Sequence, residues 1–154
     1  MESDESGTKP PVIMLVEDNP ADLRLTQEVL EEADFPHRLL VARDGEQALA
    51  MLRGQPPHQD LPLPDIVLLD LNIPRKNGLE VVSAVKQDRR LKRIPVIILS
   101  TSRAETDFAA AYDAHANAFV TKPTDWGEFA ELARHIRDFW LKSVQRWPRL
   151  PPNA

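Results

Sequence analysis

The chain has 154 residues, of which 42% are hydrophobic and 28% are charged, and its formal net charge is −5. This composition is typical of one globular domain, and the acidic balance argues against a nucleic-acid or anionic-membrane surface as the main partner. Because the sequence has no cysteine, disulfides, thiol catalysis and Cys-based metal sites are excluded.

Both ends of the chain differ in composition from its middle. Residues 1–11 are acidic and polar and lack the basic-then-apolar order of a signal peptide, so we expect a disordered tail there. Residues 145–154 are rich in proline and are expected to form a second tail. No apolar run approaches the ~20 residues that span a bilayer. We therefore expect one domain over residues 12–144, located in the cytoplasm and away from membranes.

The domain alternates short apolar segments with longer amphipathic ones. The apolar segments have the length and composition of buried strands, and they are residues 12–16, 38–42, 66–69, 96–99 and 118–121. Asn19 and Asp44 are suitable N-caps, and Gly54 is a suitable helix stop. The amphipathic segments predict helices over residues 19–33, 44–54, 78–88, 104–116 and 125–144, of which the last is extended.

The alternation of strand and helix predicts an α/β doubly wound domain. Five such pairs build a parallel sheet with helices on both faces, and strands that are apolar along their whole length fit such a covered sheet. In the five-stranded order 2-1-3-4-5, ligands bind outside the carboxyl ends of the strands, where the order reverses between strands 1 and 3.

Polar side chains end four of the five predicted strands: Glu17 with Asp18, Asp70, Ser100 and Lys122. In this topology the carboxylates would lie together at the reversal point, with the hydroxyl and the ammonium beside them. Close carboxylates need a counter-charge, and Mg²⁺ prefers oxygen ligands. A cation, an ammonium and a hydroxyl around a nucleophilic carboxylate suit a phosphoryl group.

Four sequence motifs together resemble one family. In chain order they are "LVEDNPAD", "LLDLNIPRKNG", "PVIILSTS" and "FVTKP". On them the chain resembles a response-regulator receiver domain of bacterial two-component signalling, with the CheY-like fold. The resemblance covers residues 12 to 144. It implies a Mg²⁺-dependent acceptor of a phosphoryl group from a partner histidine kinase, and a signalling protein rather than a metabolic enzyme.

The resemblance assigns the acceptor and the metal ligands. Asp70 matches the phosphoacceptor of the family. Asp18, and Glu17 either directly or through a water, match the pair of metal-binding acids. Asn72, two residues after the acceptor, matches the position whose backbone carbonyl ligates Mg²⁺.

The resemblance also assigns the groups around the phosphoryl group. Ser100 matches the hydroxyl that hydrogen-bonds it, and Lys122 matches the lysine that pairs with it. Phe119 stands at the switch-aromatic position and, having no hydroxyl, leaves a packing-only or a weak switch. The Lys122–Pro123 peptide matches one that is commonly cis in the family. The chain departs from the commoner pattern with Glu17 in place of Asp and Ser100 in place of Thr.

A closer resemblance is to the stand-alone receivers that are paired with cyanobacterial and bacterial phytochromes. It rests on "LNIPRKNG", "LSTSRAETD", "AYDAHANAFVTKP" and "IRDFWL". It implies a light-regulated histidine kinase, a bacteriophytochrome, as the partner and a tendency to form homodimers. Phe139, Trp140 and Trp147 exceed what one core-facing stripe needs, and we expect them at the dimer interface. The alternative is that the Pro-rich tail packs against the domain.

Two other functions are compatible with a carboxylate at a strand end. A haloacid-dehalogenase-type phosphatase also uses such an aspartate, but it needs a cap domain and a second Asp two residues on, where this chain has Asn72. The other is a receiver-like interaction module that never becomes phosphorylated, and the complete set of acid, hydroxyl and lysine argues against it. Because no DNA-binding module follows the receiver, we expect output through protein contact, dimerisation or onward phosphotransfer.

Overall fold

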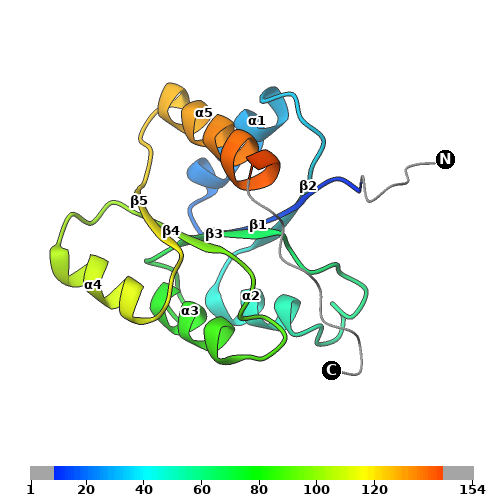
Figure 1. Ribbon diagram of the computed structural model, residues 1–154, viewed down its shortest axis with the longest axis vertical. Coiled ribbons are helices and arrows are strands. Elements are labelled where there is room, and N and C mark those ends of the chain that lie inside the picture. Colours follow the sequence, from blue (N-terminus) through cyan, green and yellow to red (C-terminus); the bar gives the residue numbers. More distant parts are fainter. Residues whose placement is uncertain (1–8, 144–154) are drawn as a thin grey trace.

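A five-stranded parallel sheet forms the centre of the computed structural model, which describes residues 9–143 (Figure 1). The strand order is β2-β1-β3-β4-β5, so the predicted order is confirmed. The strands are β1 (Val12–Val16), β2 (Arg38–Ala42), β3 (Ile66–Asp70), β4 (Val96–Ser100) and β5 (Ala118–Thr121).

Helices cover both faces of the sheet. They are α1 (Pro20–Glu32), α2 (Gly45–Leu52), α3 (Gly78–Gln87), α4 (Glu105–Asp113) and α5 (Trp126–His135). Figure 1 shows α1 and α5 together over one face, and α2 and α3 over the other, with α4 toward the β5 edge. Because helices lie on both faces, the doubly wound class is confirmed.

The predicted extended C-terminal helix is confirmed, but it is not α-helical along its whole length. After His135 the chain continues as a π-helix, η1 (Ile136–Ser143). A π-helix has i→i+5 hydrogen bonds and therefore a wider turn. This turn lets Trp140 and Leu141 both pack against the core on the side of Ile136, which an α-helix would do for only one of them.

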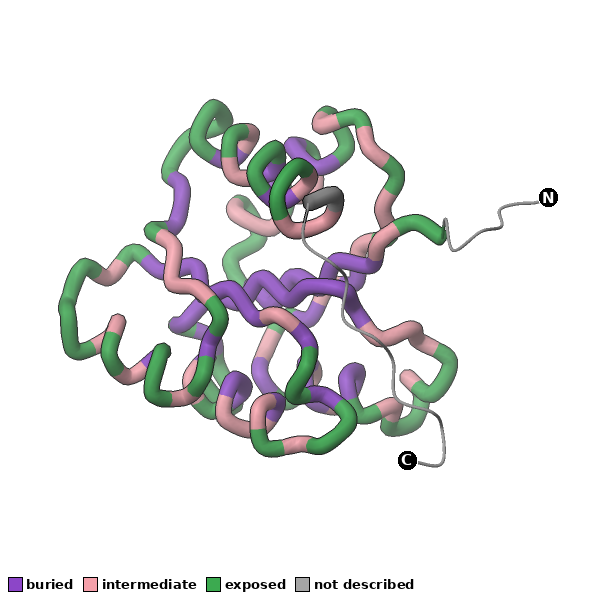
Figure 2. The backbone as a smooth tube through the Cα atoms, in the orientation of Figure 1, coloured by how far each residue is buried: buried purple, intermediate pink, exposed green. Residues whose placement is uncertain are grey.

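The core has two halves, one on each face of the sheet. Strands β1, β3 and β4 are buried along their whole length (Figure 2). Because alternate side chains of a strand point to opposite faces, Met14 and Val67 pack under α2 and α3, while Ile13 and Leu68 pack under α1 and α5. The edge strand β5 is only partly buried.

The structure covers the predicted domain of residues 12–144 except its last residue, and it covers little of the two predicted tails. Except for residues 9–11, the predicted tails lie outside the described residues, and so does Trp147. Within residues 9–143, no helix is long and apolar enough to cross a membrane.

Candidate functional site

The parallel register brings the predicted site residues to one edge of the sheet. Val16 of β1 pairs with Leu69 of β3, so that Glu17 and Asp70 stand at equivalent positions one residue further on. On the other side of β3, Ser100 pairs with Thr121, the residue before Lys122. The carboxyl ends of four strands thus meet where the strand order reverses.

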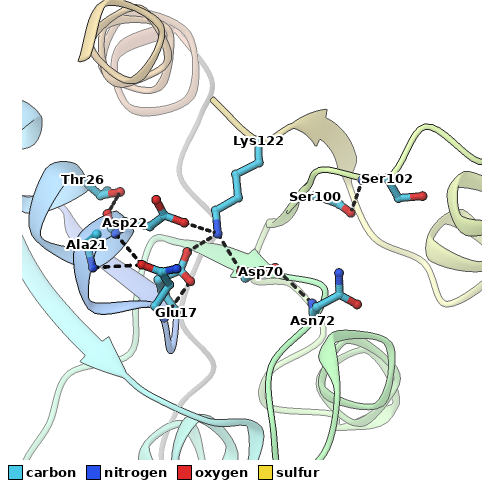
Figure 3. A network of polar contacts seen from close by, with 10 residues as sticks. Glu17, Ala21, Asp22, Thr26, Asp70, Asn72, Ser100, Ser102 and Lys122 are labelled. Atoms are coloured by element: carbon cyan, nitrogen blue, oxygen red, sulfur yellow. Dashed lines mark hydrogen bonds and ion pairs between the residues drawn. The ribbon is translucent and has the colours of Figure 1, made fainter. Parts of the chain in front are cut away.

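Lys122 is at the centre of the site. Its Nζ lies 2.8 Å from Glu17 Oε1, 2.8 Å from Asp22 Oδ2 and 2.8 Å from Asp70 Oδ2 (Figure 3). An ammonium has three N–H donors, and each has a carboxylate acceptor here. Burial by itself would lower the pKa of Lys122, but the hydrogen bonds to Asp22, Asp70 and Glu17 raise it above its ordinary value. The side chain therefore stays charged although it is buried.

Asp22 belongs to this site, although it is not among the residues predicted from the sequence. It lies in the first turn of α1, where a carboxylate is also favoured by the helix dipole. The available signal was its place in the first turn of the helix that follows the acidic pair, three residues after the N-cap Asn19. The contact with Lys122 depends on the reach of a side chain from β5 across the sheet edge.

Glu17 is almost fully buried. It accepts hydrogen bonds from Lys122 and, through Oε2, from the Asn19 backbone N–H at 3.1 Å. Burial raises the pKa of Glu17 to about 7, and the charge of Asp70 adds to the rise, while the bonds from Lys122 and Asn19 oppose it. This carboxyl group therefore titrates near neutral pH.

The acidic cluster can hold a divalent cation. One carboxylate oxygen each of Glu17, Asp18 and Asp70 lie within 4.8 Å of one another. With Asp22, four carboxyl groups lie in or beside this cluster, and within residues 9–143 Lys122 is the one cation paired with them, so positive charge is in deficit. Asp18 is exposed and gives the cluster a face toward solvent. An all-oxygen donor set of this kind fits a hard cation.

Both oxygens of Asp70 have defined partners. Oδ2 accepts from Lys122, and Oδ1 accepts from the backbone N–H of Asn72 at 3.0 Å. The backbone of Asn72 is thereby fixed beside the carboxylate. Its assignment as a carbonyl ligand of the metal stays a prediction.

The loop after Asp70 is anchored on the amino end of α2. The N–H of Gly45 donates to Pro74 O at 3.1 Å, and the N–H of Glu46 donates to Arg75 O at 2.8 Å. A Cβ on Gly45 would lie 1.9 Å from Lys76 O, so only glycine allows this approach. Arg75 and Lys76 adopt φ of 51° and 74°, in the left-handed region. The local sequence pattern around Gly45 does not indicate this anchor.

The remaining predicted groups lie around the β4 and β5 ends. Ser100 is fully buried, and its Oγ accepts the Ser102 backbone N–H at 3.0 Å. Phe119 is half-buried against Phe108, with ring centroids 4.6 Å apart in an edge-to-face arrangement. The Lys122–Pro123 peptide is trans, unlike the cis form common in the family. In this form the Lys122 side chain still reaches its carboxylates.

The aromatic residues at the end of the chain are only partly available for an interface. Phe139 is 56% exposed. Trp140 packs against the core half under α1 and α5, and its ring meets that of Phe139 at 5.6 Å and 88°. Trp140 therefore contributes to the domain itself, and Phe139 is the exposed member of the pair.

A parallel sheet in the order β2-β1-β3-β4-β5, with carboxylates, a hydroxyl and a lysine at its carboxyl edge, defines a receiver domain. The family model of the response regulator receiver domain matches residues 13–134, and the chain belongs to this family of signalling proteins.

Individual relatives are similar over nearly the whole chain. Response regulator Rcp1 of Synechocystis is 45% identical over 142 residues, which are 92% of this chain and 96% of the relative. The crystal structure of the Mn²⁺-bound form of Rcp1 has a TM-score of 0.83 at 43% identity and covers 90% of this chain and 100% of that one. The phosphorylated cyanobacterial phytochrome response regulator RcpA has a TM-score of 0.85 at 42% identity, covering 90% and 99%.

Proposed function

We propose that Asp70 accepts a phosphoryl group from a phosphohistidine of a partner histidine kinase, in a reaction that needs Mg²⁺. The observation that carries this proposal is the Lys122 ammonium, 2.8 Å from Asp70 Oδ2. An ammonium there can bind an oxygen of the incoming phosphoryl group and neutralise part of its charge. RcpA, which is similar over 90% of this chain, has been crystallised in a phosphorylated form, and this supports the proposal.

In the transfer, a carboxylate oxygen of Asp70 attacks the phosphorus atom of the phosphohistidine. The P–N bond breaks as the new P–O bond forms, and the imidazole leaves with the bonding electron pair and takes up a proton from solvent. The product is an aspartyl phosphate. Lys122 neutralises part of the phosphoryl charge, and the Ser100 hydroxyl donates a hydrogen bond to a phosphoryl oxygen.

The proposed metal ligands are the carboxylates of Glu17, Asp18 and Asp70 and the backbone carbonyl of Asn72. When bound, Mg²⁺ supplies positive charge for the phosphoryl oxygens. The donor set supports this choice of metal, because it consists of oxygens with no imidazole or thiolate. The Mn²⁺-bound form of the similar regulator Rcp1 supports divalent-cation binding in the family.

The proposed partner is a histidine kinase of the phytochrome type, acting in the cytoplasm on a receiver domain that spans residues 12–144. The support is similarity: RcpA is described as a cyanobacterial phytochrome response regulator. We propose that phosphorylation shifts a pre-existing equilibrium of the face formed by β4 and β5, where Phe119 of β5 packs against Phe108. The signal would then leave through protein contact.

We further propose that the receiver forms a homodimer through the aromatic end of the chain. The exposed ring of Phe139 supports this, since a large apolar side chain in that position is typical of an interface. Trp140 supports the ring of Phe139 from the domain side. Trp147 lies outside the described residues, and its position at the dimer interface stays a prediction.

A phosphatase of the haloacid-dehalogenase type has less support. Its second aspartate would stand at position 72, where the side chain is an amide and cannot serve as a general acid. Here the Asn72 backbone N–H binds the Asp70 carboxylate instead.

The proposed function is tested by intact-mass measurement after incubation with acetyl phosphate and Mg²⁺. A single phosphoryl adduct in the wild type, absent from Asp70→Asn and absent with EDTA, is the expected result. Asp113→Asn, at an exposed acid of α4, is the control and should keep the adduct. Failure of the wild type to form an adduct with any donor would favour the non-phosphorylated interaction module.

A further inference from the structure

The amino end of α4 is held by residues of the preceding loop. The N-cap residue is Ala104, which has no side chain that can accept a hydrogen bond from the first turn. The Ser102 Oγ accepts the backbone N–H of Ala104 itself at 3.2 Å, which fixes the residue just before the helix. The same hydroxyl donates to Asp107 Oδ2 at 2.5 Å. Asp107, in the first turn of α4, therefore fixes both the position and the proton of the Ser102 hydroxyl.

Ser102 also holds the hydroxyl of Ser100. Its backbone N–H donates to Ser100 Oγ at 3.0 Å (Figure 3). Ser100 is 0% exposed, so this bond is shielded from water. Because the oxygen accepts from Ser102, the Ser100 proton remains available as a donor, and no acceptor for it is found among residues 9–143. Such a buried, unused donor suits a ligand that arrives at the sheet edge.

We propose that Asp107 is a positioning residue for phosphoryl uptake, acting through Ser102 on the hydroxyl of Ser100. The inference rests on the proposed function, in which Ser100 donates to the phosphoryl group on Asp70. The proposal adds Asp107, a residue of α4 outside the site, which controls the orientation of the Ser100 hydroxyl. The two connecting hydrogen bonds measure 2.5 Å and 3.0 Å.

Because residue 100 is serine, its hydroxyl needs an outside partner to hold its orientation. A threonine at position 100 would have a branched Cβ and a restricted χ1 angle, whereas Ser100 has no γ-methyl group to restrict its rotamer. The position of its hydroxyl therefore depends on outside partners, and the Ser102 N–H is the partner that the structure shows. If Ser102 is held less firmly, the Ser100 hydroxyl can leave the orientation in which it donates to the phosphoryl group. Small displacements of a catalytic hydrogen-bond donor slow a reaction markedly.

The test is the initial rate of phosphoryl-adduct formation with acetyl phosphate and Mg²⁺, followed by intact mass. We expect Asp107→Ala and Ser102→Ala each to slow uptake roughly fivefold. Because the effect of Asp107 passes through Ser102, the double variant should be no slower than Ser102→Ala alone. Asp107→Asn keeps an oxygen acceptor for the Ser102 hydroxyl and should retain most of the rate. Mg²⁺ affinity, measured by calorimetry, should stay unchanged throughout.

The control is Glu105→Ala, which removes an exposed acid from the same helical turn and should leave the rate unchanged. Equal rates for Asp107→Ala and wild type would overturn the proposal. So would additive losses in the double variant, or a loss in Asp107→Asn as large as in Asp107→Ala. A wild type that forms no adduct would overturn the proposed function and this inference together, whereas an active wild type with an unaffected Asp107→Ala overturns this inference alone.

Discussion

Lys122 donates a hydrogen bond of 2.8 Å to Asp70, although β4 lies between the strands from which the two side chains come. The two residues are 52 positions apart in the sequence. The long lysine side chain crosses the sheet edge and ends among three carboxylates, which include Glu17 and Asp22. A single ammonium thus occupies the carboxylates of Glu17 and Asp70, which the proposed divalent cation would also use, so the two cations would share these ligands.

This sharing predicts the effect of Lys122→Met on metal binding. Removing the ammonium leaves the carboxylates of Glu17 and Asp70, two of the proposed metal ligands, without their lysine partner. The affinity for Mg²⁺ should therefore rise at least about tenfold, because a unit charge and a divalent cation about 4 Å apart interact by about 2 kcal/mol even in bulk water. Phosphoryl uptake should fall in the same variant, because the charge that receives the phosphoryl group is gone. Calorimetric titration and the acetyl phosphate assay measure the two effects. An unchanged or weaker Mg²⁺ affinity would show that ammonium and cation do not compete.

The anchor of the active-site loop predicts the effect of Gly45→Ala. The new Cβ would lie 1.9 Å from the backbone oxygen of Lys76, so either α2 or the loop must move. We expect a loss of about 2 kcal/mol in the free energy of unfolding, as in overpacked sites, together with slower phosphoryl uptake. Urea denaturation measures the first effect.

The matched control is Gly127→Ala in the first turn of α5. A Cβ there would meet Asp125 Oδ1 at 3.5 Å, which is ordinary van der Waals contact. Alanine replaces glycine in a helix with a gain of about 0.5–1 kcal/mol. Opposite signs for the two glycines are therefore expected, and equal effects would contradict the role of the Gly45 contact.

The sequence predicted those features that follow from local pattern and from parallel topology. Asn19 and Asp44 cap their helices as expected, and Glu17, Asp70, Ser100 and Lys122 meet at one edge because parallel strands end on the same side. The grouping of these residues needs no knowledge of side-chain positions, and so it could be predicted.

The features that were missed depend on side chains or loops that meet across elements. Asp22 joins the site only because Lys122 reaches over β4, and sequence spacing does not encode that reach. Gly45 is required by carbonyl groups of a loop about thirty residues further on. The π-helix after His135 depends on how Trp140 and Leu141 pack on the core. Each of these three features depends on packing between residues far apart in the sequence. The local sequence pattern therefore does not reveal them.

Lys86 predicts a pH dependence of stability that is separate from the active site. Its ammonium donates to Ile94 O at 2.7 Å and Lys92 O at 3.0 Å, and burial lowers its pKa to about 8. Between pH 8 and the unperturbed pKa of 10.5, the unfolded chain binds the proton and the folded chain does not. The free energy of unfolding should therefore rise with pH across this window.

The measurement is urea denaturation of wild type and Lys86→Met between pH 7.5 and 10. The stability of the wild type relative to the variant should increase by about 1 kcal/mol, less than the full shift implies because the side chain keeps some contact with water. Lys92→Met, at an exposed lysine nearby, should follow the wild type. A difference between wild type and Lys86→Met that does not change with pH would argue against a lowered pKa for Lys86.

Phe139 predicts the behaviour of the proposed dimer. Because its ring is 56% exposed, Phe139→Ser should change the free energy of unfolding of the monomer by less than about 0.5 kcal/mol. If the ring is an anchor of the interface, the same change should weaken dimerisation by tenfold or more in sedimentation equilibrium. Trp126→Ser, which removes another exposed aromatic ring at the first residue of α5, away from η1, is the control and should leave the association constant unchanged. Equal weakening by both variants would mean a general loss of apolar surface, and no weakening by Phe139→Ser would move the interface away from η1.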